Sequence, residues 1–510
     1  MRVMFKEDWM HFLWTRYEGG IRITEEVARE FIHQYRDTDV TDFVMNVNGT
    51  VASFDSGVYE SFCDKYVKTQ ENGMPVCYRE TFAAAAYDAY KVQGLDIYKI
   101  WIAALREIHI RPWASIQVND CHYNGYPTHL VKSEFVEQHP ALWRVTGKAA
   151  DGYFDKCFNF LLPQVRNRVL EFIKEVLIRY DVDGLELDFT REMLCFPVGM
   201  EAQGRAVMNG FVREIADLVD GFAKERQHAI RLSALVAESP SVNYQMGLDV
   251  YRWIREGIFD AVVPIVRWET IYYEMPVEEW KMLACGTQVA IGAGQQLLVQ
   301  PYRGYRHRIS TPEMAFGQAY ANLAKGADFL YLYNYMDMRE PGLAEVSHSH
   351  DIRNREQMAR VLCSIGTADK LKKQERWYIL TYSDTACYWD NVHCRLPIVF
   401  SSDGQSEYIK ISTGQIVGEE QAFLALGIRC AGHMGPEDMA VYCNGTNITC
   451  DGEYDFMEEL NETGVVHYKF PFTGAEGSLY QVFQIYSRKP CTICYAQVVV
   501  KEWDEVLEQH

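Results

Sequence analysis

Short β-type runs alternate with helical segments through the first 370 residues, and no other feature constrains the fold of this 510-residue chain as strongly. Strand-length runs separated by helix-length segments are typical of a parallel sheet whose strands are joined by crossover helices. Seven of the runs are clear, and the run at 158–161 is weaker. The predicted strands are 42–47, 110–118, 158–161, 184–189, 230–236, 261–266, 289–291 and 329–333. Eight strands with helices between them predict an α/β fold, the closed (β/α)8 TIM barrel.

The segments between these strands carry the apolar spacing of amphipathic helices. Residues three and four apart share one helix face, as the buried stripe of a crossover helix requires. Before the last strand, Thr311 and Pro312 suit an N-cap and a first helical position, and Gly326 suits the residue past the helix end. The clearest stripe consists of Val165, Val169, Phe172, Ile173, Val176 and Leu177.

The pattern changes after about residue 370, where β segments follow one another without helices between them. Asn444-Gly445 is a strong hairpin signal, because both positions of a type I′ turn need positive φ. We therefore predict a barrel domain at 1–370 and a C-terminal antiparallel β-sandwich domain at 371–510. The predicted strands of the sandwich are 396–400, 408–411, 439–443, 465–470, 479–486 and 494–500.

Charge and cysteine content limit the partners and the compartment. The net charge of −20 offers little to a phosphate backbone or an anionic membrane surface, which excludes nucleic acid and membrane as partners and favours a small neutral ligand. The N-terminus has no apolar run long enough for a signal peptide, and no stretch is long enough to span a membrane. Fourteen cysteines without an export signal favour reduced thiols in the cytoplasm.

The segment 180–191 is the most informative in the chain, because an apolar strand ends in two carboxylates. Residues i and i+2 of a strand share a face, so Glu186 and Asp188 point to one side. In a barrel that side is the interior near the catalytic mouth. Two buried carboxylates resist joint ionisation, which prepares one to stay protonated. Glycoside hydrolysis needs such a pair, although Glu186 as a structural residue, with Asp188 alone meeting substrate, is an open alternative.

Functional groups of a barrel come from the C-terminal ends of several strands. We expect sugar hydroxyls to be bound there by side chains with hydrogen-bond donors and acceptors. The predicted substrate-binding residues are Asn48, Asn119, Asp120, His122, Arg191, Arg267, Trp268 and Asn334.

A second catalytic carboxylate across the mouth is expected from Glu238 or Glu269, so the predicted catalytic set is Asp188, Glu186, Glu238 and Glu269. Trp268 is placed to stack on a sugar ring. The arginine-rich loop at 302–308 leaves the charge of the substrate open. We predict no metal and no cofactor, and a homodimer is left open.

The residues around Asp188 resemble the fourth-strand motif of the alpha-amylase family, in which the aspartate at this position is the nucleophile. Here Glu186 stands in place of that family's arginine. The same residues are similar to the chitinase signature, but Thr190 occupies the position of the catalytic glutamate, so a chitinase is not expected.

Most of the chain resembles the family-10-like group of bacterial glycoside-hydrolase-like barrel proteins. The resemblance implies a TIM barrel and a hydrolase of glycosidic bonds, and it leaves the substrate and the catalytic pair open. It rests on the segments 31–48, 118–122, 175–191 and 247–257.

These observations predict a cytoplasmic glycoside hydrolase that acts on oligosaccharides or small glycosides. One alternative is a metal-dependent barrel hydrolase, although the His-x-His expected at the end of the first strand is missing. Another is a catalytically inactive, carbohydrate-binding barrel, because a fold by itself never establishes chemistry.

Overall fold

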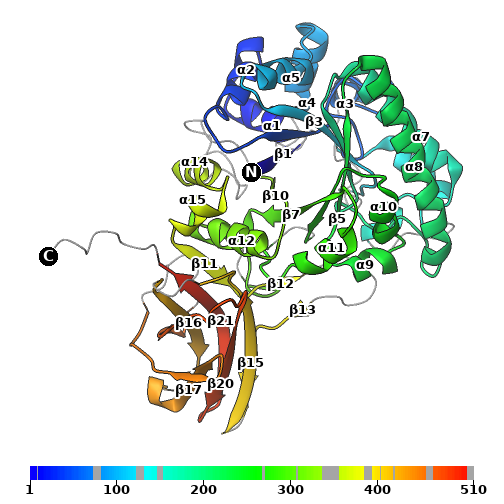
Figure 1. The fold of residues 1–510 in the computed structure, drawn as a ribbon. Coiled ribbons are helices and arrows are strands. Elements are labelled where there is room, and N and C mark those ends of the chain that lie inside the picture. Colours follow the sequence, from blue (N-terminus) through cyan, green and yellow to red (C-terminus); the bar gives the residue numbers. More distant parts are fainter. Residues whose placement is uncertain are drawn as a thin grey trace.

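A closed eight-stranded parallel barrel ringed by helices forms the first part of the chain, and antiparallel sheets follow it (Figure 1). This arrangement, taken from a computed structural model, confirms the predicted TIM barrel and C-terminal β-sandwich. The domain boundary near 370 stays a prediction. The structure describes residues 1–8, 10–72, 82–121, 131–145, 153–266, 270–305, 308–335, 355–383, 393–401, 404–416, 420–432, 434–454 and 463–501.

The barrel strands follow chain order around the barrel, and the last strand closes onto the first, with Tyr331 opposite Met4. All of these pairings are parallel, as short strands joined by crossover helices require. The strands are β1 (Arg2–Glu7), β2 (Asp42–Asn46), β3 (Arg111–Gln117), β4 (Gly184–Asp188), β5 (Arg231–Ala237), β6 (Ala261–Ile265), β7 (Ala290–Gln296) and β10 (Phe329–Tyr333).

One predicted strand is wrong, and the true eighth strand lies at the N-terminus. The run at 158–161 forms only an isolated bridge between Phe158 and Trp143, within the connection from β3 to the following crossover helix. Strand β1 takes its place. Its apolar run is only Val3, Met4 and Phe5, too short to identify a strand. The charged residues on either side form ion pairs, with Arg2 half-buried and Lys6 fully buried.

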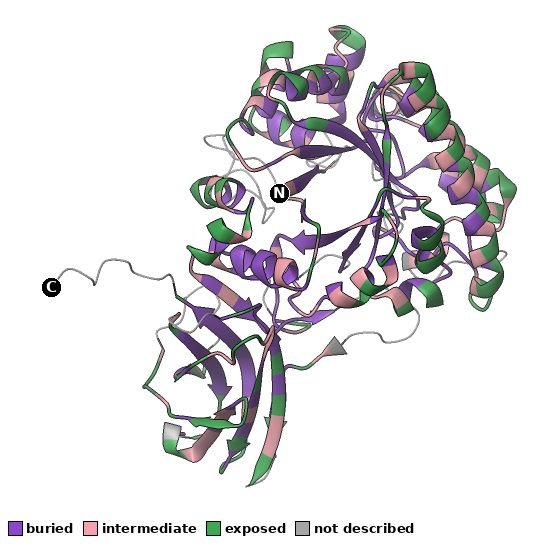
Figure 2. Cartoon of the chain, in the orientation of Figure 1, coloured by how far each residue is buried: buried purple, intermediate pink, exposed green. Residues whose placement is uncertain are grey.

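The helices cover the outside of the barrel, with exposed outer faces and buried inner faces (Figure 2). The predicted apolar stripe is buried on α7, and Thr311 caps α12 by accepting from the Met314 main chain. The described helices of the barrel part are α1 (His11–Glu18), α2 (Glu25–His33), α3 (Phe62–Asn72), α4 (Phe82–Tyr87), α5 (Ile97–Glu107), α6 (Glu134–Gln138), α7 (Pro163–Arg179), α8 (Glu201–Arg226), α9 (Pro240–Gln245), α10 (Val250–Glu256), α11 (Val277–Ala284), α12 (Pro312–Ala324), α14 (Arg355–Ser364) and α15 (Ala368–Lys372).

Side chains fill the barrel interior, so it is a packed core rather than a pore. Trp113 occupies the end where β3 begins, and Gly184 gives it room, since a Cβ there would lie 2.2 Å from the indole. Asp42 closes the same end by accepting from the Trp113 ring nitrogen at 2.9 Å and from Arg2 and Arg111. The remaining apolar lining includes Met4, Val44, Leu235, Val263, Ile265, Phe329, Tyr331 and Tyr333.

Two larger antiparallel sheets and the two-stranded sheet β12-β13 are described in the C-terminal part. The first has the order β11-β21-β16-β19 with β14 also on β21, and the second has the order β15-β20-β17-β18. The predicted hairpin at Asn444-Gly445 is confirmed, with positive φ at both residues. The strands are β11 (Arg376–Ile379), β12 (Tyr382–Ser383), β13 (His393–Cys394), β14 (Ile398–Phe400), β15 (Gln405–Ser412), β16 (Ala422–Arg429), β17 (Met439–Cys443), β18 (Thr446–Ile448), β19 (Val465–Phe472), β20 (Tyr480–Ser487) and β21 (Cys491–Val500).

The sequence did not predict β16, although it is a central strand of the first sheet. Seven of its eight residues are buried, so its sequence is a continuous apolar run without the alternation of a half-buried strand. Such a run, rich in alanine and leucine, does not differ in periodicity from a buried helical segment.

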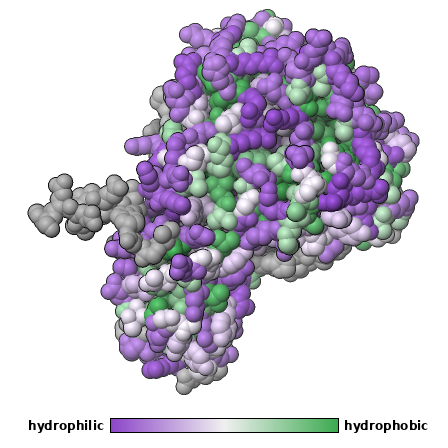
Figure 3. All heavy atoms as spheres, viewed as in Figure 1, coloured by the Kyte–Doolittle hydropathy of each residue, from purple (hydrophilic) through white to green (hydrophobic). Residues whose placement is uncertain are grey.

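Hydrophilic and hydrophobic residues occupy different regions of the molecular face seen in Figure 3. In Figure 3 hydrophilic residues dominate the outer ring of the barrel part, and hydrophobic residues gather toward its middle. Among the described residues, no helix combines the length and the apolar character that crossing a bilayer requires.

Helix α12 joins the two parts by packing against β11. A Cβ added to Gly317 would lie 2.2 Å from the main-chain oxygen of Trp377, which cannot move without displacing the strand.

We therefore expect Gly317→Ala to lower the free energy of unfolding by about 1–3 kcal/mol. Gly210 of α8 is the matched control, because a Cβ there meets nothing within 4 Å. Gly210→Ala should raise the free energy of unfolding by up to about 1 kcal/mol. Urea unfolding of both variants measures the two changes. Equal effects at the two glycines would contradict the proposed contact.

Candidate active site

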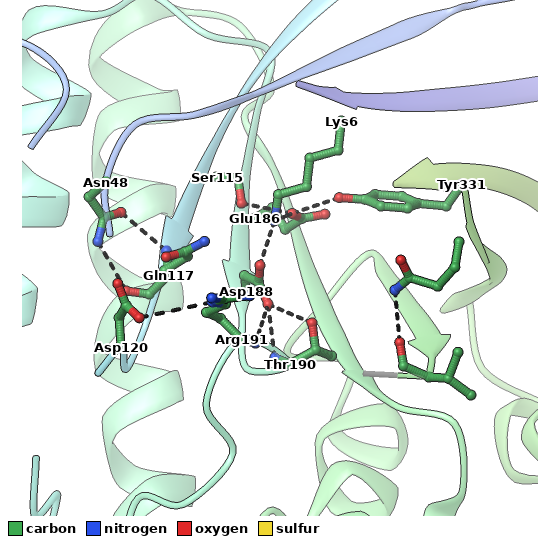
Figure 4. A network of polar contacts seen from close by, with 12 residues as sticks. Lys6, Asn48, Ser115, Gln117, Asp120, Glu186, Asp188, Thr190, Arg191 and Tyr331 are labelled. Atoms are coloured by element: carbon green, nitrogen blue, oxygen red, sulfur yellow. Dashed lines mark hydrogen bonds and ion pairs between the residues drawn. The ribbon is translucent and has the colours of Figure 1, made fainter. Parts of the chain in front are cut away.

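A buried ion cluster lies at the carboxyl end of β4, inside the barrel (Figure 4). The Lys6 ammonium of β1 lies 2.5 Å from Asp188 Oδ2 and 3.2 Å from Glu186 Oε1. All three residues have 0% exposure. Strand alternation turns Glu186 and Asp188 to the interior, as predicted, and the barrel then lets Lys6 reach them from a strand that is not a neighbour of β4.

Asp188 is held by donors on both of its carboxylate oxygens. Besides Lys6 on Oδ2, the Thr190 main-chain N–H and hydroxyl each donate to Oδ1 at 2.8 Å, and the Arg191 N–H donates at 3.2 Å. These donors fix the side chain in one orientation. Thr190 therefore serves to hold the carboxylate before it.

Glu186 lies one layer deeper, and its two oxygens differ. Oε1 accepts from the Ser115 and Tyr331 hydroxyls, each at 2.8 Å, whereas Oε2 has no hydrogen-bond partner among the described residues. Burial raises the pKa of Glu186; Lys6 opposes this shift, and the charge of Asp188 adds to it. Oε2 is consequently the atom that would carry a proton. The two carboxyl groups therefore differ, since both oxygens of Asp188 accept hydrogen bonds and Glu186 has an oxygen suited to protonation.

Lys6 keeps its charge inside the barrel. Burial lowers the pKa of its ammonium, but the attraction of Asp188 and Glu186 outweighs burial and raises the pKa overall. The ammonium also lies 5.2 Å from the centre of the Tyr333 ring, and burial raises the pKa of that phenol to about 12, so it stays neutral. The cluster therefore contains one cation shared by two acidic groups.

Further polar atoms without partners surround the cluster. In the strand register Asn46 lies opposite Ser115, and Ser233 lies opposite Glu186, so these side chains form one layer across β2 to β5. Asn46 Oδ1, Gln117 Oε1 and Ser233 Oγ are buried and have no hydrogen-bond partner among the described residues. Native proteins rarely leave buried polar atoms unsatisfied. Such atoms suit the hydroxyl groups of a bound ligand or ordered water.

Two predicted substrate-binding residues are engaged by the main chain. The Asn48 amide accepts from the Gln117 N–H and donates to the Gln117 carbonyl, both at 3.1 Å, and so joins the ends of β2 and β3. The Asn119 amide makes equivalent contacts with Phe158 and donates to the Leu194 carbonyl. Both side chains shape the mouth, and their contact with substrate stays a prediction.

The other predicted residues are distributed around the mouth. Asp120 and Arg191 form an ion pair at 4.0 Å across the ends of β3 and β4. Asn334 follows β10 in a left-handed conformation, with φ of 56°, and is half-buried. The predictions for His122, Arg267, Trp268 and Glu269 concern positions outside the described residues.

Glu238 receives a contact from the C-terminal part of the chain. Its carboxylate is buried and accepts from the Ser383 hydroxyl at 2.6 Å, while its main-chain oxygen accepts from the Trp280 ring nitrogen at 2.7 Å. Thr381 also donates to the Ile271 carbonyl at 2.6 Å, so β12 lies against the barrel mouth. The segment after β11 thus supplies a residue to the candidate site.

Sequence reasoning missed Lys6, Ser115, Tyr331 and Ser383. A signal for Lys6 was present, because it lies two residues after Met4 in a short apolar run. In a strand its side chain would therefore point to the same face as Met4. No local signal indicated Ser383, since its contact joins residues 145 positions apart.

The solved structures with a similar fold include several glycoside hydrolases. No protein-family model and no curated protein sequence significantly matches the chain, so the resemblance to the family-10-like group stays a prediction. Alpha-L-fucosidase isoenzyme 2 from Paenibacillus thiaminolyticus aligns with 73% of this chain and 49% of its own, at 14% identity and a TM-score of 0.39. The GH36 alpha-galactosidase AgaB from Geobacillus stearothermophilus aligns with 96% of this chain and 55% of its own, at 11% identity and a TM-score of 0.33.

An alpha-L-fucosidase from Vibrio sp. strain EJY3 aligns over nearly the full length of both chains, 97% of this one and 96% of its own, at 11% identity and a TM-score of 0.32. The chain spans about half the length of the Paenibacillus and Geobacillus proteins. Likenesses this distant leave the function to be argued from the site itself.

Proposed function

We propose that this chain is a glycoside hydrolase that acts on oligosaccharides or small glycosides, with Asp188 as its central carboxylate. One observation carries the proposal: the interior end of β4 holds two carboxyl groups in different environments around one buried ammonium. Glycosidic bond hydrolysis requires one group to act as an acid and another as a base or nucleophile, and the cluster supplies Asp188 as the second of these. The carboxyl end of the barrel strands is where barrel enzymes place such groups.

The roles follow from the contacts. Asp188, oriented by four donors, is the carboxylate that faces the anomeric carbon, and Lys6 fixes its position. Glu238 at the end of β5 is the acid or base across the mouth, since Ser383 orients it without depending on the Lys6 cluster. Glu186 lies behind Asp188 and adjusts the charge of the cluster. The buried atoms without partners on Asn46 and Gln117 would receive sugar hydroxyls.

The decisive experiment is hydrolysis of a panel of aryl glycosides and natural oligosaccharides, neutral and acidic, by the folded full-length protein. Turnover of one class supports the proposal, and NMR of the first-formed anomer then distinguishes retention from inversion. Failure to hydrolyse any member, together with saturable binding of an oligosaccharide in calorimetry, would replace the proposal with a carbohydrate-binding barrel.

Removal of the Ser383 hydroxyl tests the contribution of the C-terminal part. A hydrogen bond to a charged group contributes about 1.5 kcal/mol or more, so Ser383→Ala should lower kcat/KM roughly tenfold by leaving Glu238 poorly oriented. The measurement is steady-state kinetics on the best substrate of the panel. Ser401 is the matched control, because it is exposed in the same part of the chain, and Ser401→Ala should leave kcat/KM unchanged. An unchanged kcat/KM in Ser383→Ala would show that this hydrogen bond does not orient Glu238 for catalysis.

A further inference from the structure

Two cysteines and a glutamate converge beside the barrel mouth. Cys121 follows the end of β3, Glu192 follows the end of β4, and Cys157 follows the short helical turn Tyr153–Lys156 between those strands. All three are buried, and one sulfur or oxygen atom from each lies within 4.8 Å of the other two. Because three separate segments supply these groups, the fold rather than the local sequence assembles them.

We propose that Cys121, Cys157 and Glu192 bind one zinc ion. Thiolates and a carboxylate are zinc ligands, and calcium or magnesium sites use oxygen ligands alone. Zn–S bonds of about 2.3 Å place ligand atoms roughly 3.8 Å apart in a tetrahedron, which small side-chain rotations reach from the observed spacing. Three protein ligands among the described residues leave the fourth position to water.

The local charge suits such an ion. Zinc with two thiolates and one carboxylate carries a net charge of −1, and the Arg144 guanidinium interacts electrostatically with both cysteines. Arg144 donates to the Phe196 and Phe154 carbonyls at 3.1 and 3.2 Å, so main-chain groups help to hold its guanidinium in place. Arg144 would therefore offset part of this negative charge within the buried pocket.

The site has a positioning role in the mouth. Cys121 directly follows Asp120, and Glu192 directly follows Arg191, so an ion held by these two ligands would fix the connections that carry the Asp120–Arg191 pair. The ion would thus hold together the connections that leave β3 and β4. Its presence depends only on its three ligands, and it does not rest on the proposed hydrolase activity.

Metal analysis of the purified full-length protein tests the site without any activity assay. We expect about one zinc ion per chain after dialysis, and cobalt substitution should give an intense near-ultraviolet thiolate-to-cobalt absorption band together with visible bands of tetrahedral intensity. A protein without zinc that also fails to give the cobalt spectrum would overturn the proposal. A Cys121–Cys157 disulfide in the intact protein, detected by mass spectrometry, would overturn it as well.

Variants locate the site. Cys121→Ser, Cys157→Ser and Glu192→Gln should each weaken zinc binding at least roughly a hundredfold in competition with a chromophoric chelator, because each removes an ionised ligand. Cys285→Ser is the control, since that cysteine is exposed and outside the cluster, and it should leave affinity unchanged. Full affinity in both Cys121→Ser and Cys157→Ser, or loss in the control alone, would place the metal elsewhere. The cobalt spectrum of the wild type decides the proposal if a variant does not fold.

Discussion

Asp188→Asn is expected to lower kcat/KM at least about 10³-fold while the protein still folds. Asparagine keeps the shape of the side chain but removes the negative charge that would meet developing positive charge at the anomeric carbon. The asparagine NH2 group would also face a hydrogen-bond donor, either Lys6 or Thr190, so one of the hydrogen bonds to this side chain would be lost. The measurement is kcat/KM of the wild type and the variant on the best substrate, with circular dichroism to establish matched folding.

The control for this substitution is Asp328→Asn, at the opposite end of the barrel, where the carboxylate pairs with Lys281 at 2.7 Å on the surface. That variant should retain wild-type kcat/KM. Asp188→Asn with undiminished turnover would show that Asp188 is structural. Chemistry would then have to be sought at Glu238, and a catalytic role for Glu238 would survive only if Glu238→Gln abolished turnover.

Lys6→Met is expected to have the largest effect on stability, with a loss of about 3–5 kcal/mol in the free energy of unfolding. The reason is that two buried carboxyl groups would lose the cation that they share, which leaves uncompensated charge inside the barrel. Methionine preserves most of the side-chain volume, so packing contributes little to the difference. Urea unfolding followed by tryptophan fluorescence measures the change.

The loss caused by Lys6→Met should depend on pH with a defined sign. Burial already raises the pKa of Glu186 in the folded protein, so its contribution to stability is present when it is protonated and is lost as pH rises through the folded-state pKa. Removing Lys6 raises that pKa further. The destabilisation should therefore be largest at high pH, where Glu186 is ionised, and should shrink as pH falls toward the ordinary carboxyl pKa of 4.5.

Two further variants separate electrostatics from packing. Lys6→Met combined with Glu186→Gln should recover part of the lost stability at high pH, because one of the uncompensated charges is removed. Lys370→Met, which breaks an exposed pair with Asp39 at 2.6 Å, should cost no more than about 1 kcal/mol. A Lys6→Met variant that loses no more than this surface control, at every pH, would show that the cluster does not depend on its charge.

Local rules in the sequence were sufficient for seven of the eight barrel strands and for the orientation of the acidic strand. The period of two places Glu186 and Asp188 on one face, and the helical stripe of α7 identifies a crossover. The positive φ values of Asn444 and Gly445 follow from turn chemistry alone. Each inference depends on neighbours within a few residues, which is the range over which backbone geometry fixes side-chain direction.

Contacts between distant strands decided the rest. Lys6 and Asp188 are 182 residues apart in the sequence, and they meet because the closed barrel turns β1 and β4 toward a shared interior. This contact allows β1 to be buried although it carries charged residues, which is why its sequence pattern did not predict a strand. Ser383 reaches Glu238 because the segment after β11 lies against the barrel, and Cys121 meets Glu192 because β3 and β4 are neighbouring strands. The sequence by itself determined seven of the eight barrel strands and the face on which Glu186 and Asp188 lie. Only the tertiary structure decided the partners of those carboxylates, because the energy of a buried charge depends on neighbours that the folded barrel supplies.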